Sequence, residues 1–503
     1  MSESKEQNEQ NEQNGLTVHN EQSKKTRLKK QDKPEKEPGE KNKKNQEAQP
    51  NISIGASGEA RISFSNQQLK ALILPLVIEQ FLAITVGLAD SIMVASVGEA
   101  AVSAVSLVDS VNVLIFYGFS ALATGGAVVC GQFLGQKKTE KAIDSARQLL
   151  IFIVLLSAVV MGFLYLGKTA ILHGLFGDIE KSVMEYANTY FLIVEASVPF
   201  IAVYNAGAAL FRVMGNSSVS MRISIFMNII NICGNAVLIF LFHMGVAGVA
   251  VPTLISRIVG ASMVVALLLK ERYPIHLKRP FSFRMDRHTV GNILRIGVPS
   301  GLETSLFHLG KVLLLSVVST LGTASIAANA IGNTLATFQI LAAQSIGVGM
   351  ITVVSQCVGA RDFKAARFYT KKLMKWAYCS MAVLNAVLFL LLPFIMKLYQ
   401  VSEEASHYAF IILILHGGLG VILWPLSFTL PQALKAAGDT TYVMIIAVAS
   451  MWTCRIAAGI LFARYLGMGV LGIWYAMFLD WIVRIFFLVS RYRSHKWEEK
   501  YVR

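Results

Sequence analysis

The chain has 503 residues, of which 54% are hydrophobic and only 15% are charged, and its mean hydropathy is +0.53. Soluble proteins carry about 25% charged residues, so this composition excludes an ordinary soluble globular protein. The net charge of +15 does not indicate nucleic-acid binding, because the Lys and Arg side chains are spread over short loops between apolar segments.

Residues 1–65 are the first predicted segment, a disordered cytoplasmic tail. Their repeated Asn-Glu-Gln triplets and Lys-rich stretches contain almost no apolar residues. Such a segment cannot bury enough apolar surface to fold. It also lacks the apolar core of a cleavable signal peptide, so we do not expect one.

Apolar runs of about 20 or more residues follow, each long enough to cross a bilayer as a helix. We predict twelve spans, at 68–92, 102–130, 146–167, 186–211, 221–242, 246–269, 291–318, 325–354, 373–398, 407–432, 440–464 and 470–491. The expected fold class is an all-α membrane protein with twelve transmembrane helices in two pseudo-symmetric six-helix lobes.

The expectation of two lobes comes from an internal duplication at an offset of 224 residues. The second half repeats Pro75, Glu79, Leu82, Gly98, Gln132 and Gly135 as Pro299, Glu303, Leu306, Gly322, Gln356 and Gly359. Duplicated halves build the two bundles of many transporters, which move around a central site. The predicted domains are therefore an N-lobe at 66–269, a cytoplasmic connector at 270–290, a C-lobe at 291–492 and a cytoplasmic tail at 493–503.

Lys and Arg residues gather in the loops on one side of these spans. The opposite loops hold only Lys168, Lys181, Lys397 and Arg464. Because basic loops stay in the cytoplasm, we predict a multi-pass protein of the plasma membrane with both termini cytoplasmic.

The sequence offers no motif for catalysis or nucleotide hydrolysis. The five cysteines are scattered through apolar segments, no His-x-x-x-His pair is present, and no GxxxxGKS or GxxxxGKT motif occurs. We therefore expect neither an enzyme nor a cofactor, and energy for transport would come from an ion gradient or a partner.

Several short stretches resemble the multidrug and toxic compound extrusion (MATE) family. They are Gly131-Gln132-Phe133-Leu134-Gly135-Gln136, Arg212-Val213-Met214-Gly215-Asn216 and Lys435-Ala436-Ala437-Gly438-Asp439-Thr440, together with Pro75 and Pro299. The resemblance covers about 66–492. It implies two lobes around a V-shaped cavity, which export organic cations and other amphipathic compounds in exchange for Na⁺ or H⁺.

Charged side chains inside the predicted spans are candidates for function, because a charge at the bilayer centre costs roughly 2.5–3.5 kcal/mol. The acids are Glu79, Asp90, Asp109, Glu195, Glu303 and Asp480, and the bases are Arg257, Lys311, Arg455 and Arg484. From the direction of each span, we expect Asp90, Asp109 and Glu195 in the outer half of the N-lobe, at the depth of Asn231, Asn235 and Thr253.

The resemblance assigns a coupling-ion site within this layer. In the DinF-like branch of the family, an Asp fifteen residues after the proline of the first helix binds the ion, and Asp90 stands fifteen residues after Pro75. That branch adds an Asn and an Asp from its fifth helix, where this chain has Asn231 and Asn235, and a Thr that Thr253 matches. Such oxygens suit Na⁺, which makes Asp90 the candidate metal ligand, or the carboxyl could carry a proton. The alternative is an Asn pair that only bonds neighbouring helices.

Glu79, Asp109, Glu195 and Glu303 are predicted to line a substrate cavity. Glu79 and Glu303 hold equivalent places in the two copies, so they either face each other across this cavity or accept hydrogen bonds inside their own lobes.

The remaining charges of the second copy have simpler interpretations. Asp480 and Arg484 are four residues apart and are predicted to form a structural ion pair, with Arg455 as a further partner. Lys311 would either neutralise an acid or position an anion.

These patterns predict secondary active multidrug efflux, in which cationic amphipathic compounds leave the cell in exchange for Na⁺ or H⁺ by rocking-bundle alternating access. The alternative is a lipid or lipid-linked oligosaccharide flippase of the same superfamily, which would need several Arg or Lys residues in its cavity. The expected partners are small cationic drugs and the lipid bilayer, with no nucleic acid, and we expect a monomer.

Overall fold

A computed structural model describes residues 51–54, 60–176, 180–278 and 283–501. These residues all belong to one compact unit, Ala48–Arg503. The prediction for residues 1–50 lies outside the described part of the chain.

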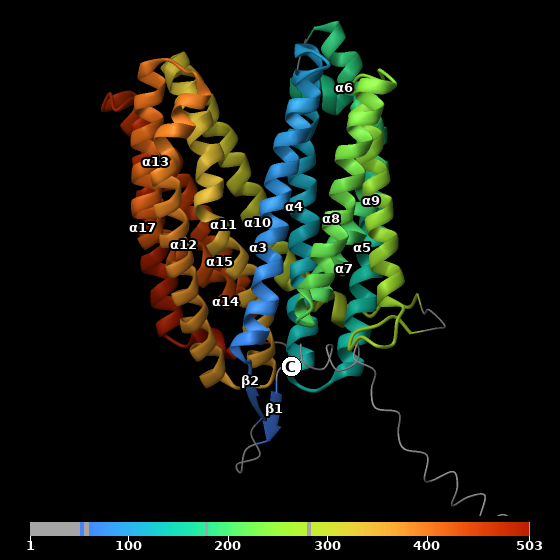
Figure 1. Cartoon of the computed structure of the whole chain (residues 1–503). Helices are drawn as coiled ribbons and strands as arrows, with labels where there is room; N and C mark the ends of the chain where they lie inside the picture. Colours follow the sequence, from blue (N-terminus) through green and yellow to red (C-terminus); the bar gives the residue numbers. More distant parts are fainter. Residues whose placement is uncertain (1–50, 55–59, 177–179, 279–282, 502–503) are drawn as a thin grey trace, which may run out of the picture. The chain divides into compact units, whose positions relative to one another are not determined.

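The first half of this unit consists of helices that run up and down beside one another (Figure 1). They are α3 (Asn66–Ala95), α4 (Glu99–Gly135), α5 (Thr139–Phe176), α6 (Lys181–Glu195), α7 (Val198–Val213), α8 (Ser217–Ala236), its π-helical extension η1 (Val237–Leu241) and α9 (Ala247–Leu268). We call α3–α9 the first lobe. Helices α6 and α7 form one span bent by 46°. Pro199, in the first turn of α7, has no backbone N–H to donate to the Glu195 carbonyl, which explains the break.

The second half repeats this pattern. It contains α10 (Arg287–Val318), η2 (Ser319–Leu321), α11 (Thr323–Gly359), α12 (Phe363–Tyr399), α13 (Glu403–Trp424), η3 (Pro425–Thr429), α14 (Leu430–Ala436), α15 (Thr440–Ser450), η4 (Met451–Ala457), α16 (Ala458–Ile460), η5 (Leu461–Tyr465) and α17 (Gly469–Arg493). We call α10–α17 the second lobe. Among the described residues, eleven helices are long and apolar enough to cross a membrane, and the bent pair supplies a twelfth span. The predicted all-α fold of twelve spans is confirmed.

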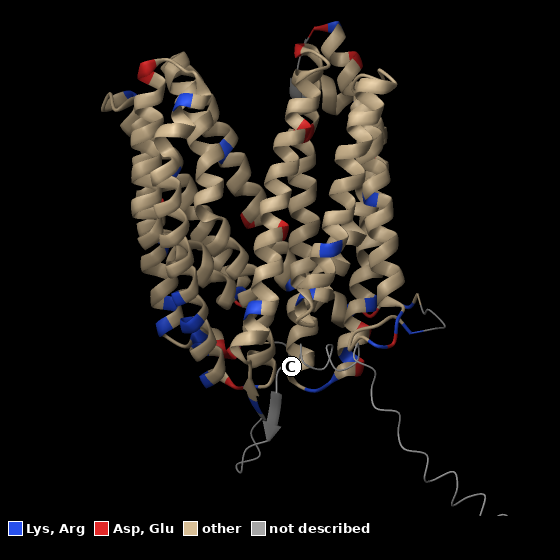
Figure 2. Ribbon diagram, in the orientation of Figure 1, with Lys and Arg blue, Asp and Glu red and all other residues tan. Residues whose placement is uncertain are grey.

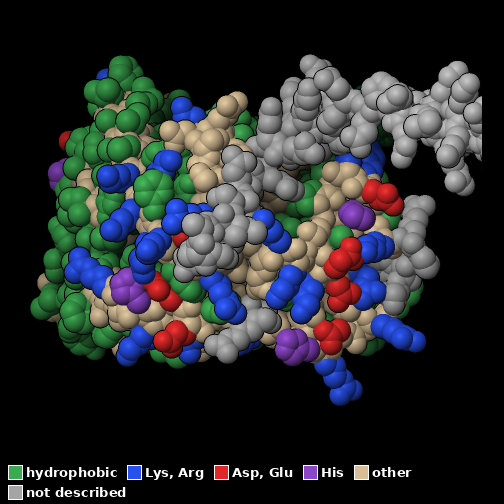
Figure 3. All heavy atoms as spheres, turned by 90° about the horizontal axis from the view of Figure 1, so that it is seen from below, with side chains coloured by type: hydrophobic (Ala, Val, Ile, Leu, Met, Phe, Trp, Pro, Cys, Tyr) green, Lys and Arg blue, Asp and Glu red, His purple; other side chains and the backbone are tan. Residues whose placement is uncertain are grey.

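The two lobes lie side by side within this unit and diverge toward one end (Figure 1). They meet in the lower half of the view, where α4 packs along α10 and α11, and α3 packs against α11. Lys and Arg residues gather at this lower end (Figure 2), and the space-filling view from below shows their side chains spread across the face (Figure 3). By the rule that basic loops stay in the cytoplasm, this face would be the cytoplasmic one.

The segment before α3 corrects the expectation of disorder up to residue 65. Strands β1 (Asn51–Ile54) and β2 (Ala60–Ser63) pair antiparallel, with Asn51 opposite Ser63. The side chains of Ile62 and Phe64 are buried, and Phe64 N donates to the Tyr369 hydroxyl at 2.7 Å. Two apolar residues at alternating positions are therefore enough to anchor this hairpin on α12 of the second lobe.

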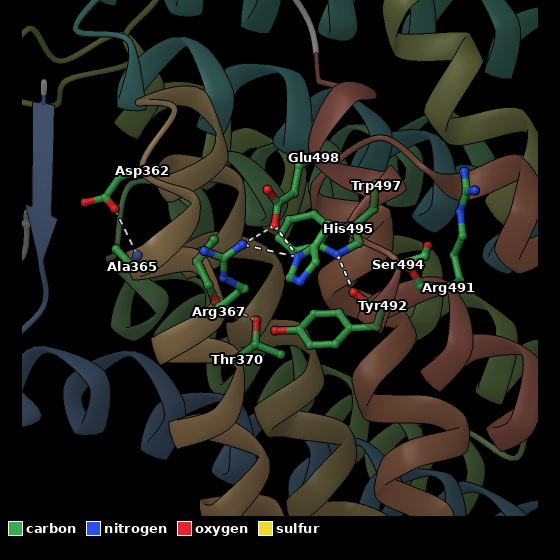
Figure 4. Close-up of polar contacts among 11 residues, drawn as sticks. Asp362, Ala365, Arg367, Thr370, Arg491, Tyr492, Ser494, His495, Trp497 and Glu498 are labelled. Carbon is green, nitrogen blue, oxygen red and sulfur yellow. Dashed lines mark hydrogen bonds and ion pairs between the residues drawn. The ribbon is translucent and has the colours of Figure 1, made fainter.

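The end of the chain also packs on α12 (Figure 4). Arg367 donates to Glu498 at 2.6 Å, and Trp497 is buried with its ring stacked on Tyr492. The short helix η6 (Lys496–Glu499) carries these contacts. Residues 493–501 are therefore part of the packed unit rather than a free tail.

The connector between the lobes is shorter than the predicted range of 270–290, and its first part packs against the first lobe. Tyr273, Ile275 and Leu277 are buried against the first lobe, and α10 begins at Arg287 rather than near residue 291. Asp286 caps this helix by accepting from the backbone N–H groups of His288 and Thr289. The hydroxyl and the backbone N–H of Thr289, followed by the His288 N–H, hold the pKa of Asp286 below its usual value.

Candidate functional site

The residues predicted to hold the coupling ion lie together in the first lobe. Asn235 on α8 donates from Nδ2 to Asp90 Oδ1 on α3 at 2.8 Å and to Asn231 Oδ1 at 3.5 Å. Asn231 Nδ2 in turn donates to Thr253 Oγ1 on α9 at 3.0 Å. The four residues thus form one hydrogen-bonded chain across three helices, which we call the Asp90 chain.

The local sequence explains this arrangement. Asn231 and Asn235 are four residues apart, so they lie on the same face of α8. Thr253 is held in place because its hydroxyl also donates to the Val249 carbonyl at 3.0 Å. Asn231 and Asn235 are buried, whereas Asp90 is half-buried and therefore accessible from one side.

The Asp90 chain has acceptor oxygens that suit a cation. Asn235 Oδ1 is buried and accepts no hydrogen bond from any described residue. A buried acceptor of this kind is costly unless a proton donor or a cation meets it. Within the described part of the chain, no group of three or more His, Cys, Asp or Glu residues could hold a metal. A cation here would therefore depend on one carboxylate together with amide and hydroxyl oxygens.

A second polar group adjoins the Asp90 chain within the same lobe. The Tyr190 hydroxyl donates to Asp109 Oδ1 at 3.2 Å, and Arg257 Nη1 donates to Ser197 Oγ at 2.6 Å. Arg257 lies close enough to interact electrostatically with Asp90, Asp109 and Glu195. Three carboxyl groups therefore share one guanidinium, which leaves this part of the first lobe with a surplus of two negative charges if all three carboxyl groups are ionised.

Glu195 does not occupy the position expected of a substrate-cavity residue. It is fully buried, and both of its carboxyl oxygens lack a hydrogen-bond partner among the described residues. Asp109 is half-buried and accepts from the hydroxyl of buried Tyr190, so its place on a substrate cavity stays a prediction.

Glu79 and Glu303 are each paired within their own lobe. Glu79 lies 3.5 Å from Arg212 Nη1 and accepts from the Ser220 hydroxyl at 3.0 Å. Glu303 Oε2 lies 2.8 Å from Lys435 Nζ. Of the two alternatives, the structure shows the one in which the acids do not face each other. Sequence reasoning missed both basic partners, although they lie inside the Arg212–Asn216 and Lys435–Thr440 stretches.

The predicted ion pair of the second lobe is present. Asp480 Oδ1 accepts from Arg484 Nε at 2.9 Å, and Arg455 Nη1 lies 3.9 Å from the other carboxyl oxygen. Arg484 also donates to Ser450 Oγ and to the Ala447 carbonyl, both at 3.0 Å. These bonds join α17 to α15 and η4, as expected for a structural role.

The lobes are joined by a symmetric pair of contacts near their Lys-rich ends, which sequence reasoning did not identify. Gln132 on α4 donates to the Ala436 carbonyl at 2.8 Å, and Gln356 on α11 donates to the Val213 carbonyl at 2.7 Å. Beside them α4 and α11 cross closely at two glycines, Gly135 and Gly359. The sequence repeat at an offset of 224 residues could have indicated this contact, because it relates Gln132 to Gln356 and Gly135 to Gly359.

Comparisons with known proteins agree with this architecture. The MatE family model matches residues 75–237 and 299–461, one stretch in each lobe. The chain is 27% identical over 434 residues to the "Uncharacterized transporter YisQ" of Bacillus subtilis, covering 85% of this chain and 94% of the relative. It is 25% identical over 450 residues to the "Probable multidrug resistance protein NorM" of Thermotoga maritima, covering 87% and 94%.

Solved structures share the fold. The outward-facing conformation of a multidrug resistance MATE family transporter of the MOP superfamily superposes with a TM-score of 0.80, at 20% identity and over 86% of this chain and 96% of that one. A MOP superfamily transporter from Pyrococcus furiosus, described as having a binding pocket of reversed polarity, superposes with a TM-score of 0.79 over the same shares at 20% identity. At this identity the likeness concerns the fold alone.

Proposed function

This chain belongs to the MATE family of membrane transporters, and we propose that within this family it is a secondary active multidrug exporter. Members of the family are transporters rather than enzymes, and the chain is a multi-pass membrane protein. In our proposal it removes cationic amphipathic compounds from the cell in exchange for Na⁺ or H⁺. The observation that carries the proposal is the Asp90 chain, which places one accessible carboxylate beside two buried amide groups and the half-buried Thr253 hydroxyl.

The Asp90 chain supports coupling because it links three separate helices of the first lobe. Asp90 lies on α3, Asn235 on α8 and Thr253 on α9. A bound cation or proton neutralises Asp90. Without it, the ionised carboxylate needs hydrogen-bond donors or a nearby cation, because an isolated charge is costly in a low-dielectric interior. The two occupancy states therefore favour different packing of the three helices, and such differential binding is what coupling requires.

The position of this group favours the DinF-like branch of the family. The coupling carboxylate is in the first lobe, at the place in α3 that this branch uses, and Asn235 replaces the second acid. The equivalent place in α10 is Leu314, which cannot bind an ion. The two lobes thus have different tasks despite their common origin.

The proposal includes an orientation. With the Lys-rich end in the cytoplasm, both termini are cytoplasmic and the lobes diverge toward the outside of the plasma membrane (Figure 2). Ions would then reach Asp90 from outside, and the closed crossing of α4 and α11 would lie on the inner side. The chain would alternate between this arrangement and one open to the cytoplasm, working as a monomer.

The experiment is efflux of ethidium from liposomes that contain the purified full chain, under an imposed Na⁺ or H⁺ gradient. Asp90→Asn should lose gradient-driven efflux while it folds and inserts normally, because Asn retains the shape but cannot carry the charge. Glu99→Gln is the matched control, since Glu99 is an exposed acid at the same end of the first lobe. Unchanged efflux by a well-folded Asp90→Asn variant would refute ion coupling through this residue.

A further inference from the structure

The second lobe contains a group of charges that the proposed function leaves unexplained. Lys311 on α10, Arg455 on η4, and Asp480 and Arg484 on α17 lie in the interior of their spans. The Asp480 carboxylate pairs with both arginines: Oδ1 lies 2.9 Å from Arg484 Nε, and Oδ2 lies 3.9 Å from Arg455 Nη1. The group therefore has three basic side chains and one acid.

Lys311 has no acidic partner. No carboxylate of the described residues lies within ion-pair distance of its ammonium group, whereas Glu303 and Asp439 are taken by Lys435 and Arg491. Its Nζ lies 5.7 Å from the centroid of the Phe307 ring, and the same ring has Arg455 at 5.3 Å and Arg484 at 5.5 Å. A ring can attract cations but cannot cancel their charge.

Lys311 differs from the two arginines of this group in its exposure. Arg455 and Arg484 are buried, and Arg455 Nε has no hydrogen-bond partner among the described residues. Lys311 is exposed. The Lys311 ammonium group and the guanidinium of Arg455, whose Nε–H has no partner among the described residues, therefore both lie beside the Phe307 ring. Of these two cations, Lys311 is the exposed one.

The position of Lys311 places it beside the junction of the two lobes. His308, three residues earlier on α10, stacks on Tyr117 of α4 with ring centroids 4.3 Å apart. Residues three apart are neighbours on a helix surface. Lys311 thus lies about one helical turn further along α10 than His308, the residue that contacts the first lobe.

The net positive charge of the Lys311 group favours the binding of an anion. Each unneutralised charge deep in a membrane costs roughly 2.5–3.5 kcal/mol, and this group has a surplus of two positive charges. The first lobe has the opposite surplus, since Asp90, Asp109 and Glu195 share Arg257. A compound that carries charges of both signs would match the two lobes at once.

We propose that Lys311 and Arg455 form a subsite for a carboxylate group of the transported compound, so that the preferred substrates are amphiphiles that bear both an amine cation and a carboxylate. This inference rests on the proposed export function and narrows its substrate class. Lys311 would act as a specificity-determining residue that meets the carboxylate, with Phe307 contacting the adjoining apolar part.

The test compares rhodamine B, which has a free carboxylate, with its ethyl ester, which is only cationic. Both dyes are offered to the purified full chain in liposomes under the same gradient. The wild-type chain should export rhodamine B with the lower KM. Lys311→Met should raise the KM for rhodamine B about tenfold relative to that for the ester, the size expected for loss of one charge-assisted bond, and Lys311→Arg should restore much of the difference.

Lys397→Met provides the matched control, because Lys397 is exposed at the far end of α12, and it should leave both KM values unchanged. Equal changes for the two dyes in a folded Lys311→Met variant, or equal inhibition of both by chloride, would overturn the subsite. Export of the ester but not of rhodamine B by the wild-type chain would overturn the subsite while leaving the exporter intact. Export of neither dye would refute the exporter proposal itself.

Discussion

Replacing Gly359 by alanine should specifically destabilise the arrangement of the lobes seen in this structure. A Cβ at Gly359 would lie 2.0 Å from the carbonyl oxygen of Gln132 and 2.6 Å from its Cα, and a Cβ at Gly135 would lie 2.0 Å from the carbonyl oxygen of Gln356. The obstructing atoms are helix backbone, so no side-chain rotation can relieve the contact. Helices α4 and α11 would have to separate.

The magnitude follows from this geometry. Adding one methyl group to a packed interface costs typically 1–3 kcal/mol. The cost falls only on the arrangement in which α4 and α11 cross at these glycines. If the lobes separate here in the alternative state, the equilibrium should shift toward that state by roughly 5- to 150-fold. Loss of the bonds from Gln132 and Gln356 would add to the shift.

A single reporter cysteine can measure this shift. Ser355→Cys would be placed on α11 close to the crossing, at a residue that is fully buried in this structure, in a chain whose five native cysteines are replaced by alanine. A membrane-impermeant maleimide, added from the side of the Lys-rich loops, should label it faster when Gly359→Ala is present.

Gly301→Ala is the control, because its Cβ would lie an ordinary 3.6 Å from the Cβ of Ala121. It should leave labelling unchanged. Equal labelling rates and equal thermal stability in the Gly359→Ala and Gly301→Ala variants would refute the idea that this crossing closes the inner side.

Three further predictions concern single contacts. Asn235→Asp should preserve transport but alter its Na⁺ or pH dependence, measured by efflux in matched gradients, and an unchanged dependence would contradict a role beside Asp90. Arg212→Met should lower the free energy of unfolding by about 2 kcal/mol, because the buried Glu79 would lose the half-buried cation that neutralises it. Adding Glu79→Gln should recover much of this in thermal unfolding. Phe64→Ala should cost about 3 kcal/mol by losing its packing on Tyr369, and an unchanged midpoint would show that the hairpin does not contribute.

Much of the candidate site could be predicted from the chain itself. The apolar spans and the repeat at 224 residues indicate twelve helices and two lobes, because the length and hydropathy of a membrane helix are local properties. Depth follows from position within a span, and the four-residue spacing of Asn231 and Asn235 places them on one face. These two facts, together with the family resemblance, were sufficient to name the residues that form the Asp90 chain.

Tertiary structure alone decided which charges pair across long separations in the sequence, whereas the i,i+4 pair of Asp480 and Arg484 was predictable from local spacing. Glu79 and Glu303 occupy equivalent places in the repeat, but only the packing of α3 on α8 and α7, and of α10 near α14, shows that Arg212 and Lys435 neutralise them. The choice depends on side chains more than 130 residues apart in sequence, and no local pattern encodes it. The same applies to Tyr190 beside Asp109, and to the hairpin strand at Ile62, whose burial depends on the surface of α12. Hydrophobic periodicity determines which segments become helices, whereas the choice of partner for each buried charge depends on how the completed lobes pack, since a carboxylate in a low-dielectric interior needs the nearest cation whatever its place in the sequence.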